Sequence, residues 1–316
     1  MKKLFIVFIL ITVGLLVWWN ISLSPVNPTD KHSEIFVVEK GAGIKSIARR
    51  LYEKNLIRNQ TFFYLLIKQM GIENKIKAGS FRLSPSLSSR QIATSLTKSS
   101  LDIWVTIPEG KRAEEIGDIL ETSLPSYKGA WRQQLDANEG YLFPDTYLFP
   151  AQSSIEQIIT TMRNNFDKKY EQVNADKTVD LTQEQIVIVA SIVEREAVSS
   201  ADMDIVASVL ENRLSLGMAL GSDVTVEYAL GYQPAIKTWW KKDLSVNDLQ
   251  IHNPYNTRLN SGLPPTPISN PGLVALKAAA NPPSSDYLYF IADKKGVVHF
   301  AKTLQGHNAN IQKYGL

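Results

Sequence analysis

Two glutamates, Glu194 and Glu196, follow an apolar run and are the first residues in the sequence whose type and position could support chemistry. A carboxyl at the end of a buried helix should have a raised pKa, because burial disfavours its charged form, and a general acid needs such a pKa. Positions two apart lie on nearly opposite sides of a helix, so at most one should face a given pocket. The alternative is that both carboxylates simply meet water where the helix emerges.

The element that would position these carboxyls is a helix predicted over residues 182–197. Thr182 and Gln185 form a capping-box pattern at its start. Seven of the next eight residues, 186–193, are apolar, and a helix that is apolar on all sides belongs in a core. The many β-branched residues leave a buried strand as the alternative, but the cap and the length favour a helix.

The N-terminus has the pattern of a membrane anchor. Lys2 and Lys3 precede an uncharged run, and residues 4–23 together are long enough to cross a bilayer. The lysines predict a cytoplasmic tail at residues 1–3, and Trp18 and Trp19 suit the opposite interface. No small-x-small site follows, so we expect an uncleaved, single-pass anchor in the inner (plasma) membrane. Everything from about residue 21 onward would then lie outside the cytoplasm.

Composition excludes several classes of function. A net charge of +3 over 316 residues is too small to indicate a nucleic-acid partner. The absence of cysteine excludes thiolate chemistry, and the four histidines, at 32, 252, 299 and 307, lack the spacing of metal ligands. We therefore expect neither a cofactor nor a metal.

The expected organisation after the anchor is a polar linker at 24–33, a small module at 34–100, a connecting α/β segment at 101–152 and a catalytic domain at 153–316. The strand-helix-helix-strand order of 34–83 resembles a LysM module in its pattern, while a spacer or packing domain is the alternative. Residues 139–150 carry four aromatics, which predict either a sugar platform or, preferably, a packed corner.

The C-terminal half holds most of the polar motifs. Asp223 or Ser222 is expected to cap a helix through Tyr228. Residues 252–272 contain five prolines and two glycines, which predict an extended loop, and long ordered loops are often functional. A helix at 273–280, a hairpin formed by 287–292 and 296–301, and a last helix starting at His307 are expected to follow.

Taken together, these motifs resemble the YceG-like family of endolytic murein transglycosylases (MltG). The residues that carry the resemblance are 105–110 (VTIPEG), 139–147 (EGYLFPDTY), 190–196 (ASIVERE), 212–214 (NRL), Gly217, Met218, Asp223, Thr225, Tyr228, 255–257 (YNT), 262–265 (GLPP), 270–272 (NPG), 287–290 (YLYF), His307 and Asn308. The match covers essentially the whole chain after the anchor. It implies an α+β protein with a C-terminal domain similar to the lysozyme-like fold of lytic transglycosylases.

The resemblance also implies an activity. Such enzymes are lyases that cut glycan strands between N-acetylmuramic acid and N-acetylglucosamine and leave a 1,6-anhydromuramyl end. The resemblance assigns the catalytic acid to Glu196, and we assign substrate binding to Asp223, Thr225, Tyr228, Tyr255, Asn256 and Thr257. The chain departs from the family pattern at Gly221, where glutamine is usual, and at Val224, where proline is usual; both bear on substrate preference. Ala197 follows the acid, where classical lytic transglycosylases have serine.

Two other functions stay open at this point. A muramidase would pair Glu196 with Asp223 as the second carboxylate that hydrolysis requires. A non-catalytic scaffold would use the anchor and the LysM-like module to hold peptidoglycan near its synthases. Membrane tethering favours nascent strands as the substrate, and suggests penicillin-binding proteins and the elongation or division machinery as partners.

Overall fold

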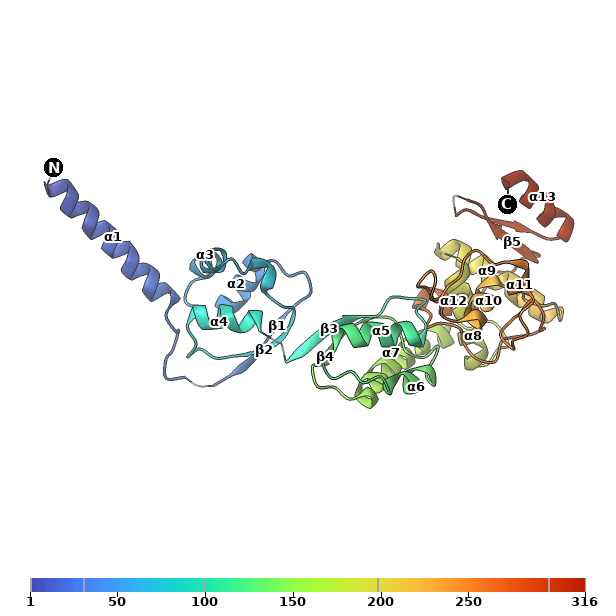
Figure 1. Cartoon of the computed structure of the whole chain (residues 1–316), viewed down its shortest axis with the longest axis horizontal. Helices are drawn as coiled ribbons and strands as arrows, with labels where there is room; N and C mark the ends of the chain where they lie inside the picture. Colours follow the sequence, from blue (N-terminus) through green and yellow to red (C-terminus); the bar gives the residue numbers. More distant parts are fainter. Residues whose placement is uncertain (1, 31, 99–100, 198, 295, 316) are drawn as a thin grey trace. The chain divides into compact units, whose positions relative to one another are not determined.

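The structure is a computed structural model that describes residues 2–30, 32–98, 101–197, 199–294 and 296–315, except for the side chains of 2–9, 15 and 16. The chain contains both helices and strands, as expected for an α+β protein (Figure 1). The chain divides into two compact units, of which the smaller comprises residues 1–105 and 147–153, and the larger comprises 106–146 and 154–316. Within the predicted connecting segment at 101–152, residues 101–105 and 147–152 belong to the smaller unit and residues 106–146 to the larger.

Helix α1 (Lys2–Leu23) coincides with the predicted anchor. Within the residues that the structure describes, however, no helix is both long enough and apolar enough to span a bilayer. The predicted span at 4–23 is not supported by this finding, and the side chains of 4–9, 15 and 16 lie outside the described set. The predicted cytoplasmic tail at 1–3 begins with Met1, which is likewise outside it. The rings of Trp18 and Trp19 lie 4.8 and 5.3 Å from the ring of Phe62.

The smaller unit has the expected strand-helix-helix-strand order. Its elements are β1 (Glu34–Val38), α2 (Ile44–Glu53), α3 (Gln60–Met70), the short 3-10 helix η1 (Glu73–Lys75), β2 (Gly79–Leu83) and α4 (Ser89–Thr97). Phe36, Leu51 and Phe63 are fully buried between these helices and strands. The order matches the predicted pattern, and the likeness to a LysM module stays a prediction.

One four-stranded sheet contains β1, β2, β3 (Asp102–Thr106) and β4 (Thr146–Pro150), in that order. Strands β1 and β2 are antiparallel with Phe36 opposite Phe81, and β2 is antiparallel to β3 with Ser80 opposite Asp102. Strand β4 was not predicted, because the two prolines and the aromatic residues of the segment 139–150 suggested an irregular corner.

The larger unit is mostly helical. Its elements are α5 (Ala113–Ser123), α6 (Trp131–Asp136), α7 (Ile155–Ala175), α8 (Gln183–Glu196), α9 (Ser200–Ser215), α10 (Asp223–Leu230), α11 (Val246–Leu249), α12 (Leu273–Ala280), the hairpin of β5 (Tyr289–Ala292) and β6 (Val298–Ala301), and α13 (Leu304–Tyr314). Helix α12 begins and ends as predicted. Helix α13 begins earlier than predicted, because Thr303 and not His307 caps it.

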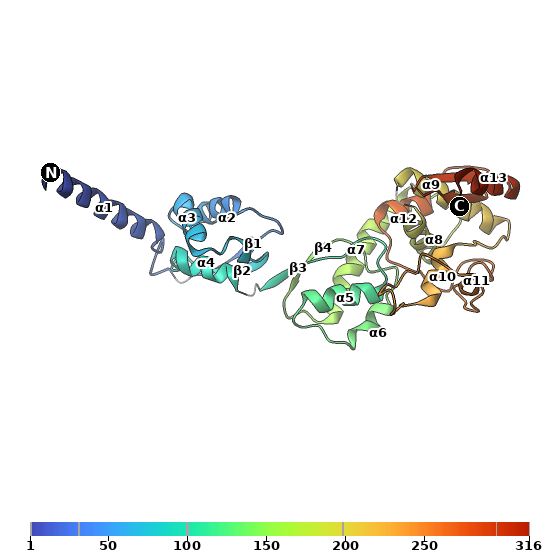
Figure 2. The same cartoon turned by 45° about the horizontal axis from the view of Figure 1, so that its top comes forward.

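Helix α8 is the centre of this unit. The predicted capping box is present, since the Gln185 amide N–H donates to the Thr182 hydroxyl at 3.3 Å and the Thr182 N–H donates to the Gln185 side chain at 2.9 Å. Every residue from 186 to 193 is buried, which confirms the predicted core helix. Helices α9 and α12 pack against α8, and α12 also contacts α7 (Figure 2).

The aromatic segment 139–150 is a packed corner and not an open sugar platform. Leu142 and Phe143 are buried, and the Tyr141 ring packs edge-on against Phe166 at 5.0 Å. Gly140 adopts a positive φ of 88°, and an added Cβ would lie 2.5 Å from Pro267 and 2.9 Å from Val187 of α8. The corner, the 252–272 loop and α8 therefore meet where only glycine fits.

We expect Gly140→Ala to destabilise the larger unit by about 1–3 kcal/mol through overpacking, in addition to about 1–2 kcal/mol for the left-handed backbone. Gly217→Ala is the matched control, because Gly217 has a φ of 66° and nothing within 4 Å of an added Cβ. Denaturant unfolding of both variants measures the difference. Equal losses of stability would contradict the close contact at Gly140.

Candidate active site

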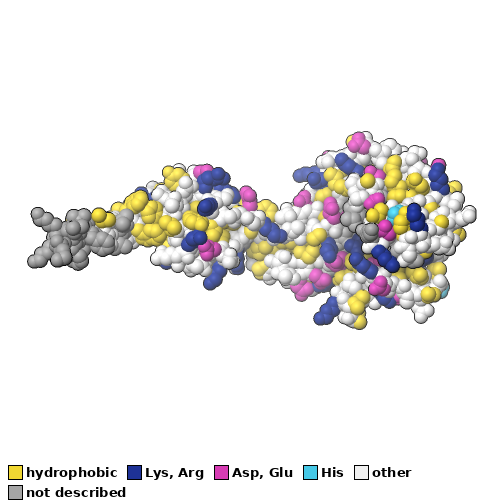
Figure 3. All heavy atoms as spheres, turned by 90° about the horizontal axis from the view of Figure 1, so that it is seen from above, with side chains coloured by type: hydrophobic (Ala, Val, Ile, Leu, Met, Phe, Trp, Pro, Cys, Tyr) yellow, Lys and Arg dark blue, Asp and Glu magenta, His cyan; other side chains and the backbone are white. Residues whose placement is uncertain are grey.

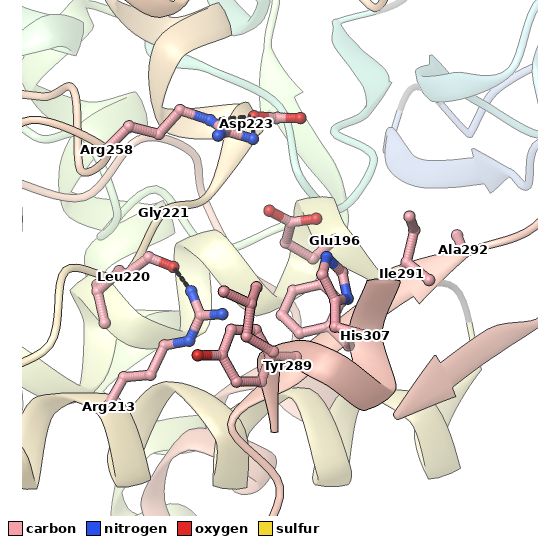
Figure 4. A pocket seen from close by; sticks show the side chains of 12 residues that line it. Glu196, Arg213, Leu220, Gly221, Asp223, Arg258, Tyr289, Ile291, Ala292 and His307 are labelled. Atoms are coloured by element: carbon pink, nitrogen blue, oxygen red, sulfur yellow. Dashed lines mark hydrogen bonds and ion pairs between the residues drawn. The ribbon is translucent and has the colours of Figure 1, made fainter. Parts of the chain in front are cut away.

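A pocket of about 470 Å³ lies at the carboxyl end of α8 (Figure 4). Its volume is within the range of small-molecule sites. In the close view, Asp223 and Arg258 lie on one side of Glu196, with Tyr289 and His307 on the other. The pocket is lined by residues from α8, α9, α10, the β5–β6 hairpin, α13 and the loops before α10 and before α12. These residues are Glu196, Arg213, Leu220, Gly221, Asp223, Arg258, Tyr289, Phe290, Ile291, Ala292, Leu304 and His307.

Glu196 is the last residue of α8 and is partly buried in this pocket. Burial raises the pKa of its carboxyl to about 7, and the nearby Asp223 carboxylate acts in the same direction. The Ser222 hydroxyl donates a 2.5 Å hydrogen bond to the carboxyl, and this bond, with Arg258 and Arg213, moderates the rise. Glu196 can therefore carry a proton near neutral pH and is exposed enough to give it to a bound molecule.

Glu194 lies on the other side of α8, as the helical spacing predicts. Its carboxylate accepts a 2.9 Å hydrogen bond from the Gly272 N–H, at the start of α12. Its Cγ also lies close to Gly110, where an added Cβ would be 3.2 Å away. Burial raises the pKa of Glu194 to about 7 as well, but the residue does not line the pocket. Its contacts give it a structural role.

Asp223 lines the pocket, and of the two predicted caps of α10 it is not the one that the structure shows. Ser222 occupies the cap position of α10, and its side chain turns to Glu196 instead of capping the helix. Asp223 is exposed and forms an ion pair with Arg258, with its Oδ1 2.7 Å from Nε and 2.6 Å from Nη2. The second carboxylate at the pocket is therefore already paired with a cation (Figure 4).

Thr225 and Thr257 are fully buried behind the loop that carries Ser222. Their hydroxyls are 2.8 Å apart, the Thr225 hydroxyl donates to the Ser222 carbonyl at 2.7 Å, and the Thr257 hydroxyl accepts from the Ser222 N–H at 3.1 Å. The sequence assigned both threonines to substrate binding. The structure shows them bonded to the protein instead, where they hold Ser222 in place.

Asn256 also lies away from the pocket. It is fully buried, and its side-chain amide donates to the carbonyls of Leu249 and Ile251 at 3.1 and 3.0 Å. A buried polar side chain is normally satisfied in this way by the backbone it supports. The Asn256 side chain is therefore occupied by backbone carbonyls just before the 252–272 loop.

Tyr228 and Tyr255 form a separate cluster, with their rings 4.8 Å apart. The Arg112 guanidinium lies 4.0 Å from the Tyr228 ring and 4.8 Å from the Trp239 ring, which is the geometry of a cation–π contact. Burial raises the pKa of Tyr228. Neither tyrosine lines the pocket around Glu196, so of the six predicted binding residues only Asp223 does.

Several pocket residues were missed as site residues by the sequence analysis. Arg213, Tyr289 and His307 stand in motifs that had been noticed without a role, and Ser222 had been considered only as a cap. Glu227, on α10, is buried with a pKa raised to about 7, mainly by burial and against the opposing effect of Arg195. The sequence motifs drew attention to Arg213, Tyr289 and His307. That these residues lie near Glu196 could not be predicted, because it depends on contacts between segments far apart in the sequence.

The arrangement allows the single carboxyl of Glu196 to act first as a general acid and then as a general base. Protonated Glu196 can donate to a leaving oxygen, and the resulting carboxylate is stabilised by the Ser222 hydroxyl and by the charges of Arg213 and Arg258. It can then accept a proton from the attacking group.

On the visible face of the larger unit, acidic, basic and hydrophobic side chains are interspersed (Figure 3).

Comparison with known proteins places these features in a family. Residues 36–313 match the YceG-like family. The chain is 30% identical to an endolytic murein transglycosylase of Bacillus subtilis, with 96% of this chain and 91% of the relative aligned. It is 28% identical to an endolytic murein transglycosylase of Streptococcus pneumoniae, and the match spans 98% of this chain but only 64% of that longer relative.

A solved structure agrees with the sequence relatives. The crystal structure of a YceG-like protein from Listeria monocytogenes is 32% identical in sequence and superimposes with a TM-score of 0.57, covering 89% of this chain and 99% of that one. The family match extends over most of the chain and contains the whole pocket around Glu196. The chain belongs to the YceG-like family.

Proposed function

We propose that this protein is a peptidoglycan lytic transglycosylase with Glu196 as its catalytic acid and base. The observation that carries the proposal is the single partly buried carboxyl at the pocket, with a pKa of about 7 and two arginines nearby. The relatives named endolytic murein transglycosylases support the same activity. The substrate would be the glycan strand, cut within the chain at the bond between N-acetylmuramic acid and N-acetylglucosamine.

The reaction needs one carboxyl and no water. Protonated Glu196 gives its proton to the oxygen that leaves with N-acetylglucosamine, as the bond from that oxygen to the muramyl C1 breaks. The Glu196 carboxylate then removes the proton of the muramyl C6 hydroxyl, whose oxygen bonds to C1. The product is a 1,6-anhydromuramyl end, and Glu196 is protonated again.

The pairing of Asp223 with Arg258 favours this reaction over hydrolysis. A hydrolase needs a second carboxylate that is free to activate water or to attack C1. Asp223 is the other carboxylate that lines the pocket in the described part of the chain, and it lies 2.7 Å or less from two nitrogens of Arg258. The muramidase reaction is therefore the second candidate, and product analysis separates the two.

The cellular setting is part of the proposal. Lys2 and Lys3 followed by the uncharged run to Trp19 support an anchor in the inner membrane with the catalytic unit facing the cell wall. Such a tether would favour nascent strands close to penicillin-binding proteins and to the elongation or division machinery. Cleavage there would limit strand elongation.

We expect Glu196→Gln to abolish strand cleavage, because glutamine cannot donate the proton. Glu194→Gln is the matched control, since it removes a carboxyl with a similarly raised pKa from the other side of α8. Mass spectrometry of products from purified peptidoglycan measures the outcome. The parent and the control should release muropeptides one water lighter than reducing-end products.

Reducing ends from the parent would instead establish hydrolysis and return Asp223 to the mechanism. If the Glu196→Gln enzyme were active and the Glu194→Gln enzyme inactive, the catalytic acid would be Glu194 and not Glu196. Absence of products from the parent, on nascent and mature strands alike, would contradict the enzymatic proposal and favour a wall-binding scaffold.

The pH dependence tests the hydrogen bond between Ser222 and Glu196. Because the acid must be protonated, kcat/KM should fall as pH rises through about 7. Ser222→Ala removes a bond that lowers the pKa of Glu196, so this alkaline decline should move to higher pH. Removing a hydrogen bond to a charged group is worth about 1.5–3 kcal/mol, or roughly one to two pH units. A decline at unchanged pH would show that Ser222 does not tune the acid.

Membrane attachment has its own test. Expressed in a bacterial host, the full chain should stay with the membrane fraction after alkaline carbonate washing, whereas residues 24–316 should be released. An external protease should reach the catalytic unit in spheroplasts and leave it intact in whole cells. Release of the full chain by carbonate would contradict the anchor.

A further inference from the structure

We propose that Arg213 and the wall around it form a subsite for the D-lactyl group of the muramyl residue, which Arg213 recognises through the lactyl carbonyl or carboxylate oxygen. This inference rests on the proposed function, since it names the part of the substrate that the pocket around Glu196 would recognise. The lactyl ether on O3 is the group by which N-acetylmuramic acid differs from N-acetylglucosamine. A site that places the muramyl C6 hydroxyl beside Glu196 can select that sugar only through this group.

Arg213 is held rigidly at the pocket. Its Nε donates to the Leu288 carbonyl at 2.6 Å and its Nη1 donates to the Leu220 carbonyl at 2.5 Å. The guanidinium lies 5.1 Å from the centre of the Tyr289 ring, within cation–π range. Two of its five N–H groups are therefore fixed by the backbone. Within the described part of the chain, no hydrogen bond is formed by Nη2.

Arg213 forms no salt bridge among the residues that the structure describes, and the carboxyl that interacts with its charge is that of Glu196, so Arg213 lacks a counter-charge while Glu196 is protonated. Arg258 differs, because Asp223 neutralises it at 2.6 Å. A buried cation normally has a counter-charge. The unneutralised guanidinium, fixed at the wall of a pocket with free donors, is thus complementary to an oxygen that carries negative or partial negative charge.

His307 offers a second polar atom to the same group. Its ring stacks on Tyr289 with centres 5.4 Å apart, so that Arg213, Tyr289 and His307 line one wall (Figure 4). The Nδ1 of His307 is buried without a hydrogen-bond partner among the described residues. Burial and the nearby Arg213 lower the pKa of His307, which favours the neutral ring, and Nδ1 can pair with one further polar atom.

The rest of this wall is apolar. Phe290, Ile291 and Ala292 of β5 and Leu304 of α13 line the pocket beside His307. The lactyl group combines a carbonyl oxygen with a methyl group on the adjacent carbon. A fixed donor fork bordered by apolar side chains matches both features, whereas a plain 3-hydroxyl would leave the guanidinium unpaired and the apolar wall empty.

Binding of three oligosaccharides of equal length tests the inference in the full chain carrying Glu196→Gln, which prevents turnover. The first has muramyl residues with a free lactyl carboxylate, the second has the lactyl group amidated by peptide, and the third is a chitooligosaccharide without it. We expect the carboxylate form to bind best, the amide next and the chitooligosaccharide weakest. The first and the third should differ by about tenfold or more, as for a hydrogen bond to a charged group.

Arg213→Gln should reduce that difference to about threefold or less, since a neutral amide cannot provide the charged fork. Arg213→Lys keeps the charge without the fork and should give an intermediate value. Lys313→Gln is the matched control, because it removes a positive charge from α13 at a residue that does not line the pocket, and it should leave the preference unchanged. Thermal unfolding of each variant establishes that it is folded.

Two outcomes would overturn the inference without any Arg213 variant. The Glu196→Gln protein could bind the three oligosaccharides equally, or high salt could leave the carboxylate preference unchanged where screening should weaken it. A preference that survives intact in a folded Arg213→Gln protein would overturn it as well. Failure of the proposed function looks different, since the parent would then release no anhydro products from any strand, whatever its binding preference.

Discussion

The burial of helix α8 is the constraint on which the site depends. Residues 186–193 are inaccessible to solvent on every side, so the helix cannot turn or slide without exposing apolar surface at about 25 cal/mol per Å². Its carboxyl end is therefore fixed, and Glu196 ends the helix where the macrodipole is negative and the ionised carboxylate is disfavoured. The same packing that stabilises the unit thus raises the pKa of its last residue. Arg213 and Arg258 limit that rise and would stabilise the anion once the proton has left.

Placing Glu196 also requires segments that lie far apart in the sequence. Ser222 approaches it from the start of α10, and two buried threonines, Thr225 and Thr257, hold the backbone of Ser222. Arg213 joins α9 to the loop before α10 and to the start of the hairpin through two backbone carbonyls. The acid is thus supported by a hydrogen-bonded network whose members touch one another. Such networks lose more than the sum of their single bonds when one member is removed.

The parts of the fold that the sequence predicts well are those governed by local rules. The cap of α8, its apolar run, α12 and the β5–β6 hairpin follow from capping, periodicity and turn chemistry. Strand β4 did not, because its pairing within the sheet outweighs the two prolines. The substrate-binding role predicted for Thr225, Asn256 and Thr257 stays a prediction, but the structure shows that all three side chains are buried and bonded to the protein. Polar residues in a proline-rich loop suggest a binding surface, yet an irregular backbone has carbonyls and N–H groups that buried side chains must satisfy.

A raised pKa alone does not identify the acid. Burial lifts the pKa of Glu139 to about 8 and those of Glu194, Glu196 and Glu227 to about 7. Glu139 accepts from the Ala113 N–H at the start of α5, and Glu194 accepts from the N–H before α12, so both carboxyls bind backbone of their own protein. Glu196 is the member of this group that lines a pocket. A general acid must be buried enough to keep its proton and open enough to release it to a substrate. Among these four carboxyls, Glu196 combines both conditions with two nearby arginines that stabilise the anion.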